Sequence, residues 1–257
     1  MFINFYKYHG AGNDFIIVNN LDEKLTLSPQ AIKYLCDRHF GIGADGFMEL
    51  LPSRKNDFAM RYYNSDGKEG TMCGNGGRCI VAFAQKIGII QKKAIFDAID
   101  GTHKATIETD KTISLKMNDV NSYQLKGKNI FITDTGSPHY VQFTENINAI
   151  DVIEEGRKIR YSEAFPDGIN VNFVEIKNDK IYMRTYERGV ENETLACGTG
   201  TVAVAIAAHI LKQITPPIEI HARGGILQVN FETNGRNFKD IILRGPATFV
   251  FEGVIEV

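Results

Sequence analysis

The sequence repeats itself at an offset of about 124 residues, and this repeat limits the possible folds more than any other feature. The segment Cys73-Gly74-Asn75-Gly76 returns 124 residues later as Cys197-Gly198-Thr199-Gly200. Three further matches occur in the same order at offsets of 123 to 125 residues: Met60-Arg61-Tyr62-Tyr63-Asn64 with Met183-Arg184-Thr185-Tyr186-Glu187, Gly12-Asn13-Asp14-Phe15 with Gly136-Ser137-Pro138-His139, and Gly43-Ala44-Asp45 with Gly168-Ile169-Asn170. These ordered matches predict two homologous halves of about 120 residues, the size of an ordinary domain.

Within each half, strand-like stretches surround one apolar helix. The apolar runs at 78–87 and 201–212 each follow a Cys-Gly-x-Gly segment and predict helices that are buried on nearly every side. Short β-branched and aromatic runs bounded by turn residues predict strands at 16–18, 58–62, 105–107, 113–117, 130–133, 139–141, 172–176 and 181–184. We therefore expect an α+β fold of two pseudo-symmetric domains. Each would be a mostly antiparallel sheet or barrel wrapped around a central helix, with a joint near 117–127 and the active site in the cleft between the domains.

Composition excludes several classes of function. The 257 residues have a formal net charge of −2, which gives no general electrostatic attraction to nucleic acid. No stretch reaches the roughly 18–20 uncharged apolar residues of a membrane span. Lys7 and His9 interrupt what would be the apolar region of a signal peptide, so we expect a cytoplasmic protein.

The four cysteines are Cys36, Cys73, Cys79 and Cys197. They are too few and too irregularly spaced for a disulfide framework, and no pair has Cys-x-x-Cys spacing. The six histidines include no His-Glu-x-x-His motif, so we expect no metal site. The cysteines are expected to be reduced thiols, with Cys36 and Cys79 in the core.

Cys73 and Cys197 hold equivalent places, each before a glycine-rich turn that opens a helix. A helix N-terminus has unpaired N–H groups and a partial positive charge, which lower the pKa of a thiol. A lone cysteine there could simply be a small residue at a tight turn, but two related by the repeat favour chemistry. Inversion of a stereocentre needs a base on one face of a carbon and an acid on the other, and two matched thiols from domains that close on a substrate would supply them.

The chain resembles the diaminopimelate epimerase family over essentially its whole length. The resemblance rests on motifs from both halves: His9-Gly10-Ala11-Gly12-Asn13-Asp14-Phe15, Arg38-His39-Phe40-Gly41-Ile42-Gly43-Ala44-Asp45-Gly46, Tyr63-Asn64-Ser65-Asp66-Gly67, Met72-Cys73-Gly74-Asn75-Gly76-Gly77-Arg78-Cys79, Gly136-Ser137-Pro138-His139, Gly168-Ile169-Asn170, Tyr186-Glu187-Arg188-Gly189 and Ala196-Cys197-Gly198-Thr199-Gly200. It implies epimerisation of LL-diaminopimelate to meso-diaminopimelate on the route to lysine, without pyridoxal phosphate or any other cofactor, by a homodimer. It also implies that residues from about 246 to 257 return to the first domain, giving domains of 1–117 with 246–257 and 118–245.

The resemblance assigns roles to individual residues. Cys73 and Cys197 would be the two acid/base groups, and His139 and Glu187 would modulate their pKa values. Arg188 could take the distal carboxylate of the substrate in a bidentate fork. The substrate-binding set is Asn13, Asn64, Gly74, Asn75, Asn170, Glu187, Arg188, Gly198 and Thr199. Two positions depart from some family members, which have Gln at Gly46 and Asn at Ser137.

Each assignment has a structural alternative. Glu187 and Arg188 could form a surface ion pair, His139 could be a hydrogen-bonded sheet residue, and Asn13 and Asn170 could serve their own turns. The alternative functions are a proline-racemase-type enzyme of the same fold, a phenazine-biosynthesis-like isomerase, a non-catalytic anion-binding module and a thiol redox switch. The paired cysteines argue against a phenazine-biosynthesis-like isomerase and against an anion-binding module. The whole-chain repeat argues against a thiol redox switch.

Overall fold

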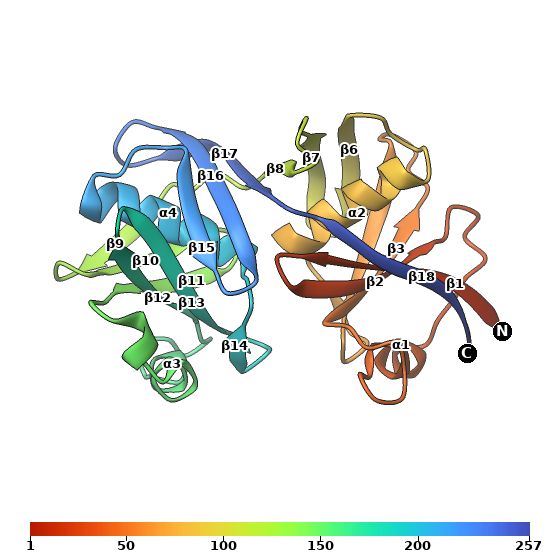
Figure 1. Cartoon of the computed structure of the whole chain (residues 1–257), viewed down its shortest axis with the longest axis horizontal. Coiled ribbons are helices and arrows are strands. Elements are labelled where there is room, and N and C mark those ends of the chain that lie inside the picture. Colours follow the sequence, from red (N-terminus) through yellow and green to blue (C-terminus); the bar gives the residue numbers. More distant parts are fainter. The chain divides into compact units, whose positions relative to one another are not determined.

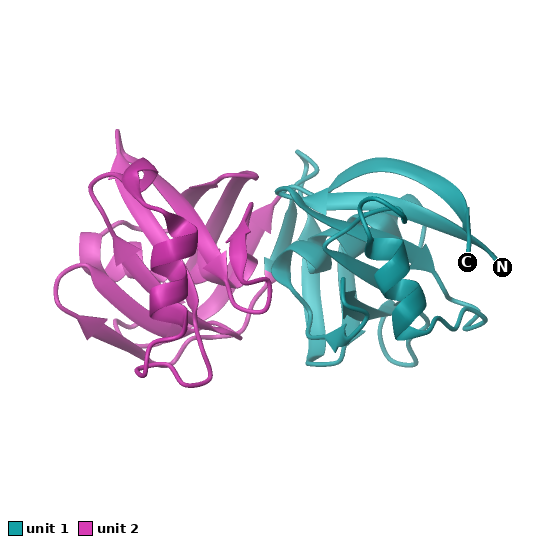
Figure 2. Cartoon of the chain, turned by 90° about the horizontal axis from the view of Figure 1, so that it is seen from below, with its two compact units in different colours: residues 1–115, 246–257 teal, residues 116–245 magenta.

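The computed structural model describes all residues from 1 to 257. The chain divides into two compact units, Met1–Leu115 with Pro246–Val257, and Lys116–Gly245 (Figure 2). This division lies two residues before the boundary at 117/118 expected from the sequence. Met117 belongs to the second unit, because its N–H donates to the carbonyl of Ile241.

The first unit wraps a mixed sheet around helix α2. Strand β1 lies between β18 and β2 in antiparallel pairs, β2 and β3 are parallel, β3 and β4 are antiparallel, β4 and β6 are parallel, and β6, β7 and β8 continue antiparallel. Helix α2 contacts β1, β2, β3, β7 and β18. The elements are β1 (Phe2–Gly10), β2 (Asn13–Asn19), α1 (Pro29–Cys36), β3 (Gly46–Leu51), β4 (Phe58–Asn64), β5 (Glu69–Gly70), α2 (Gly74–Lys86), β6 (Lys93–Ala98), β7 (Gly101–Ile107), β8 (Ile113–Lys116) and β18 (Thr248–Glu256) (Figure 1).

The second unit repeats this plan around helix α4. Strands β11 and β12 are parallel, β12 and β13 antiparallel, β13 and β15 parallel, and β15 and β16 antiparallel, in the same succession as β2, β3, β4, β6 and β7. Helix α4 contacts strands β10 to β13 and β15 to β17. The elements are β9 (Tyr123–Lys126), β10 (Ile130–Asp134), β11 (Pro138–Phe143), η1 (Ile147–Ala149), α3 (Val152–Arg160), β12 (Asn170–Lys177), β13 (Lys180–Glu187), β14 (Asn192–Thr194), α4 (Gly198–Lys212), β15 (Ile218–Ala222), β16 (Gly225–Thr233) and β17 (Phe238–Gly245). The predicted two-repeat α+β fold is confirmed.

The two central helices begin earlier than the sequence predicts. The predicted starts are residues 78 and 201, whereas α2 begins at Gly74 and α4 at Gly198. The apolar residues of α4 from Val202 to Ala208 are fully buried, as expected for a helix that is apolar all round. No helix is long and apolar enough to cross a membrane.

Helices α1 and α3 lie outside the sequence prediction, which assigned one helix to each half. Both are short and amphipathic, and both have ordinary capping residues. Ser28 caps α1 and Asp151 caps α3, each accepting a hydrogen bond from a backbone N–H of the first turn. Helix α1 contacts β3, and α3 contacts β12, β13 and β14. Their buried residues, such as Leu35 and Val152, belong to core clusters that contain neither Cys73 nor Cys197.

Candidate active site

Cys73 is the N-cap residue of α2. Its backbone is extended, and its Sγ accepts a hydrogen bond from the N–H of Gly76 at 3.2 Å. A Cβ at Gly76 would lie only 3.2 Å from that sulfur, so glycine allows the close approach. The sulfur thus takes the place of the oxygen acceptor of an ordinary cap, at the positive end of the helix dipole.

Cys197 is the N-cap residue of α4 with the same local geometry. Its Sγ accepts from the N–H of Gly200 at 3.4 Å, and the residue is 5% exposed. The structure therefore confirms that both cysteines stand at helix starts, where a thiolate is stabilised.

The sulfur of Cys73 lies beside two amide side chains. Asn75 Nδ2 donates to Asn13 Oδ1 at 3.2 Å, and the same oxygen is 4.0 Å from Cys73 Sγ. Asn13 Nδ2 donates to Asp45 Oδ2 at 2.8 Å. Asn13 begins β2 after the two-residue turn Ala11-Gly12, in which both residues have positive φ. Its side chain bonds to other segments, so the interpretation of Asn13 as a residue serving its own turn is wrong.

A charged network fixes the strand and loop that hold Asn13. Arg38 binds both oxygens of Asp14, at 2.7 and 3.0 Å, and also Asp45 at 2.8 Å. Buried Lys7 lies 2.7 Å from Asp14 and also donates to the carbonyl of Gly43. Burial raises the pKa of Asp14, but the hydrogen bonds and charges of Arg38 and Lys7 outweigh this and hold it at about 2. The carboxyl group of Asp14 therefore stays ionised at neutral pH.

Arg78 is a functional candidate that sequence reasoning left without a role. It is fully buried in α2, and its guanidinium donates to the carbonyl of Gly74, to Asn75 Oδ1 and to the carbonyl of Pro246. Burial lowers its pKa to about 10, which keeps it a cation at neutral pH. It orients the amide of Asn75, whose Nδ2 is then directed at Asn13. The motif Cys-Gly-Asn-Gly-x-Arg contained this signal, but burial of the cation could not be read from spacing.

Asn64 ends β4 at an exposed position, and its Oδ1 accepts from the hydroxyl of Tyr62 at 3.1 Å. Gly46 pairs with Asn64 across β3 and β4. A Cβ at Gly46 would lie 2.5 Å from the ring of Tyr62, so this tyrosine occupies the space that a longer residue at position 46 would need.

In the second unit His139 connects to Cys197 through Thr199. The Nε2 atom of His139 lies 2.9 Å from Thr199 Oγ1, which lies 3.5 Å from Cys197 Sγ. His139 is fully buried, and burial together with the charge of Arg188 lowers its pKa from 6.5 to about 3. It is therefore neutral at physiological pH. His139 is both a hydrogen-bonded sheet residue and a neighbour of the Cys197 cluster.

Asn170 joins three segments at the start of β12. Its Nδ2 donates to Ser137 Oγ at 2.7 Å and to the carbonyl of Pro138 at 3.1 Å, while its Oδ1 accepts from the N–H of Arg188 at 2.8 Å. The turn interpretation is therefore wrong for Asn170 as well. Ser137 keeps a hydrogen bond to Asn170 where some family members have an asparagine.

Glu187 ends β13 and Arg188 follows it, and their side chains bond to different segments. Glu187 Oε2 accepts from the hydroxyl of Thr194 at 2.9 Å. Arg188 is exposed, and its guanidinium donates to the carbonyl of Asp167 at 3.2 Å. An exposed guanidinium bonded to a single carbonyl keeps several N–H groups for an anionic ligand.

The other two cysteines are core residues, as predicted. Cys36 is 4% exposed and Cys79 is fully buried. Burial raises the pKa of Cys36 to about 12 and raises that of Cys79. No group of three or more His, Cys, Asp or Glu side chains is placed to hold a metal ion.

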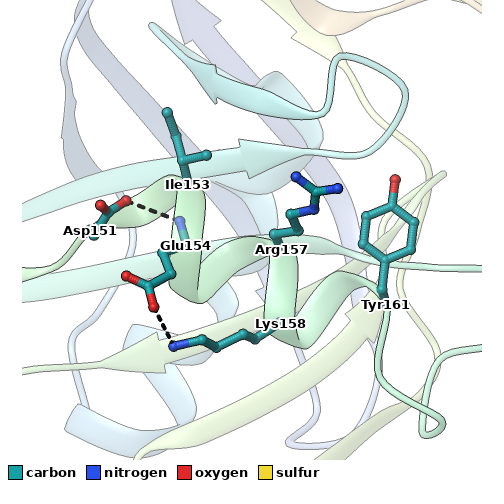
Figure 3. Close-up of a pocket in the computed structure, with 6 residues that line it drawn as sticks. All are labelled: Asp151, Ile153, Glu154, Arg157, Lys158 and Tyr161. Carbon is teal, nitrogen blue, oxygen red and sulfur yellow. Dashed lines mark hydrogen bonds and ion pairs between the residues drawn. The ribbon is translucent and has the colours of Figure 1, made fainter.

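A surface pocket of about 760 Å³ lies along α3 (Figure 3). Its lining residues are Asp151, Ile153, Glu154, Arg157, Lys158 and Tyr161, and none was predicted as a site residue. Lys158 pairs with Glu154 at 2.8 Å, and Asp151 accepts from the N–H of Glu154 at 3.0 Å. Neither capping cysteine lines the pocket.

Comparison with known proteins adds a family to this geometry. The family model for diaminopimelate epimerase matches residues 5–122 and 131–250. A diaminopimelate epimerase of Flavobacterium psychrophilum is 49% identical over 97% of this chain and 99% of its own length. One of Chlorobaculum tepidum is 43% identical over 96% of this chain and 98% of its own length.

Solved structures with low sequence identity share the fold. A phenazine biosynthesis protein of the PhzF family from Bacillus anthracis aligns with a TM-score of 0.80 at 14% identity, covering 100% of both chains. A hydroxyproline epimerase from Agrobacterium vitis aligns with a TM-score of 0.70 at 15% identity, covering 99% of this chain and 92% of its own. At these identities the similarity extends to the fold alone.

Proposed function

Because the chain belongs to the diaminopimelate epimerase family, we propose that it interconverts LL- and meso-diaminopimelate by a two-base mechanism with Cys73 and Cys197. The proposal rests above all on one observation. Both cysteines are N-caps of the central helices of two repeated units, each sulfur accepting from the third N–H that follows it. The family is one of epimerases, so the chain is an isomerase, and the proposed reaction is a step on the route to lysine.

The proposed chemistry uses each thiol on one face of the α-carbon. A thiolate removes the α-proton and becomes a thiol, and the opposite thiol delivers its proton to the carbanion and becomes a thiolate. After one turnover the protonation states of Cys73 and Cys197 are exchanged, so the enzyme is ready for the reverse reaction. An α-proton is far less acidic than a thiol, so the developing negative charge must be stabilised. Backbone N–H groups at the helix starts of Gly74 and Gly198 are suited to hold the α-carboxylate.

The remaining assignments concern the substrate's two amino-acid heads. Arg188 would take the distal carboxylate in a bidentate fork, since its guanidinium is exposed and has N–H groups to spare. Glu187 and the amides of Asn13, Asn64 and Asn170 would accept from ammonium groups or donate to carboxylates. Asn75 and Thr199 would bind through the first turns of α2 and α4. A homodimer and a cytoplasmic location stay predictions.

Solvent labelling tests the mechanism. Purified protein is incubated with LL-diaminopimelate in deuterated water without pyridoxal phosphate, and label is followed in product and in recovered substrate. The product should carry label before the recovered substrate does, because the proton delivered comes from the second thiol, which has exchanged with solvent. Early product without label would contradict two bases, and no meso product at all would contradict the function.

Cysteine variants test the residues. Cys73→Ala and Cys197→Ala should each abolish epimerisation, and the double variant should be no worse than either single one, because the thiols act as a unit. Cys36→Ala is the matched control, since it removes a buried thiol from α1 and should keep turnover. Substantial turnover by either active-site variant would refute the assignment.

A further inference from the structure

A chain of buried polar side chains lies behind Cys197. Thr185 Oγ1 donates to Asn172 Oδ1 at 3.0 Å, and Asn172 Nδ2 lies 3.1 Å from Nδ1 of His139. The chain continues from His139 to Thr199 at 2.9 Å and from Thr199 to the sulfur at 3.5 Å. Asn172 is fully buried and Thr185 is 2% exposed.

The direction of each hydrogen bond follows from one carbonyl. Asn172 Nδ2 also lies 3.1 Å from the carbonyl oxygen of Tyr140, which can only accept. This fixes the amide, so the NH₂ group is the donor to Nδ1 of His139. Because Nδ1 accepts, the proton of the neutral ring is on Nε2 and is donated to Thr199 Oγ1. The hydroxyl proton of Thr199 is then left to point at the sulfur of Cys197.

The first unit lacks this chain, although its fold is the same. His139 pairs with Asn170 as Phe15 pairs with Gly46, which sets the offset at 124 residues. The position equivalent to Asn172 is therefore Met48. A Cβ added at Gly200, the third residue of α4, would meet the side chain of Asn172, and a Cβ added at Gly76, the third residue of α2, would meet the side chain of Met48. Phe15 and Met48 are fully buried. The same fold thus forms in the first unit with apolar residues at these two positions. Folding alone therefore does not explain why the second unit has the polar pair His139 and Asn172.

We propose that Asn172 is a positioning residue that fixes the tautomer of His139 and thereby directs the hydroxyl of Thr199 to Cys197. A hydroxyl that donates to the sulfur stabilises the thiolate over the thiol. The catalytic consequence rests on the proposed function, whereas the tautomer assignment does not.

The first test reads the two ring nitrogens of His139 directly. In ¹⁵N-histidine-labelled protein, NMR should show Nδ1 without a proton and Nε2 with one. In Asn172→Asp a carboxylate faces Nδ1 and can only accept, so Nδ1 should become protonated. Val174→Ala is the matched control, because it removes buried methyl groups two residues along the same strand and should leave both nitrogens unchanged. A protonated Nδ1 in the unaltered protein, or an unchanged ring in Asn172→Asp, would overturn the proposal.

The second test measures turnover of diaminopimelate. Asn172→Leu should lower kcat at least tenfold relative to Val174→Ala with a smaller change in KM, since a misdirected hydroxyl weakens acid/base transfer more than binding. A kcat equal to that of Val174→Ala would overturn the catalytic part. If the ring nitrogens behave as expected but the unaltered protein does not epimerise diaminopimelate, the proposed function fails while the tautomer assignment stands.

Discussion

The buried imidazole of His139 makes a quantitative prediction about stability. Burial and the charge of Arg188 lower its pKa to about 3 in the folded protein, whereas an unfolded chain has a histidine pKa of about 6.5. Between these two values the unfolded chain binds a proton that the folded chain does not. The stability contributed by the neutral ring is therefore fully present above about pH 6.5 and is lost progressively as the pH falls toward 3.

The size of the effect follows from the two pKa values. Each pH unit inside the window costs about 1.4 kcal/mol. Because protonation of the unfolded chain is only beginning at pH 7, the loss between pH 7 and pH 5 is about 2 kcal/mol. Above pH 5 most carboxylates are still ionised in the unfolded chain, so this interval isolates histidine.

The assay is urea unfolding followed by far-ultraviolet circular dichroism at pH 7 and pH 5. The unaltered protein should lose about 2 kcal/mol more over this interval than His139→Gln, whatever the absolute stability of the variant. His39→Gln is the control, since it removes an exposed histidine. Equal pH dependence in the unaltered protein and His139→Gln would refute the assignment of a neutral, buried ring.

Three further substitutions test single contacts. Arg188→Lys should raise KM for diaminopimelate at least tenfold, because an ammonium cannot present a planar fork to a carboxylate. Unchanged steady-state kinetics would show that Arg188 does not bind the substrate. Arg78→Met should lower the free energy of unfolding by about 2–4 kcal/mol, since two buried acceptors and one partly buried acceptor lose their donor; a loss below about 1 kcal/mol in urea would show that water replaces the guanidinium. Gly200→Ala would place a Cβ 2.6 Å from Asn172 Oδ1, so it should cost about 1–3 kcal/mol and shift the ring nitrogens of His139; an unshifted NMR spectrum would show that the amide does not move.

The sequence was enough to predict the repeat, the helix-start cysteines and eight strands, β2, β4, β7, β8 and β10 to β13, because these depend on local patterns. The other strands, such as β1, β3, β6 and β15 to β17, were not predicted. The prediction placed the helix starts too late. Glycine-rich segments have low helix propensity, and cysteine is not among the usual capping residues. The first turns of α2 and α4 form because the sulfur atoms accept backbone N–H groups. Helices α1 and α3 were not predicted although Ser28-Pro29 and Asp151 are ordinary start signals, since helices of 8 and 9 residues have too few turns for a clear apolar period.

Arg78 and Asn172 show where sequence reasoning stops. The buried guanidinium bonds to the carbonyl of Pro246, 168 residues away, and the buried amide bonds to the carbonyl of Tyr140, 32 residues away. A buried polar residue is predictable only when its partners are known, and here one partner of each residue comes from a distant part of the chain. The contact of Arg78 with Pro246 and that of Asn172 with Tyr140 have no spacing that could be read along the chain.

Arg78 and Asn172 also lie outside the matches between the two halves. At an offset of 124 residues Arg78 corresponds to Val202, and Asn172 corresponds to Met48. The first unit thus has a buried cation close to its capping thiol, and the second has a neutral polar chain behind its own. In the proposed mechanism one sulfur is a thiolate while the other is a thiol, and different surroundings favour one of these two protonation states over the other. A search for identity between the halves therefore finds the capping cysteines, which both halves share, and passes over Arg78 and Asn172, at which the halves differ.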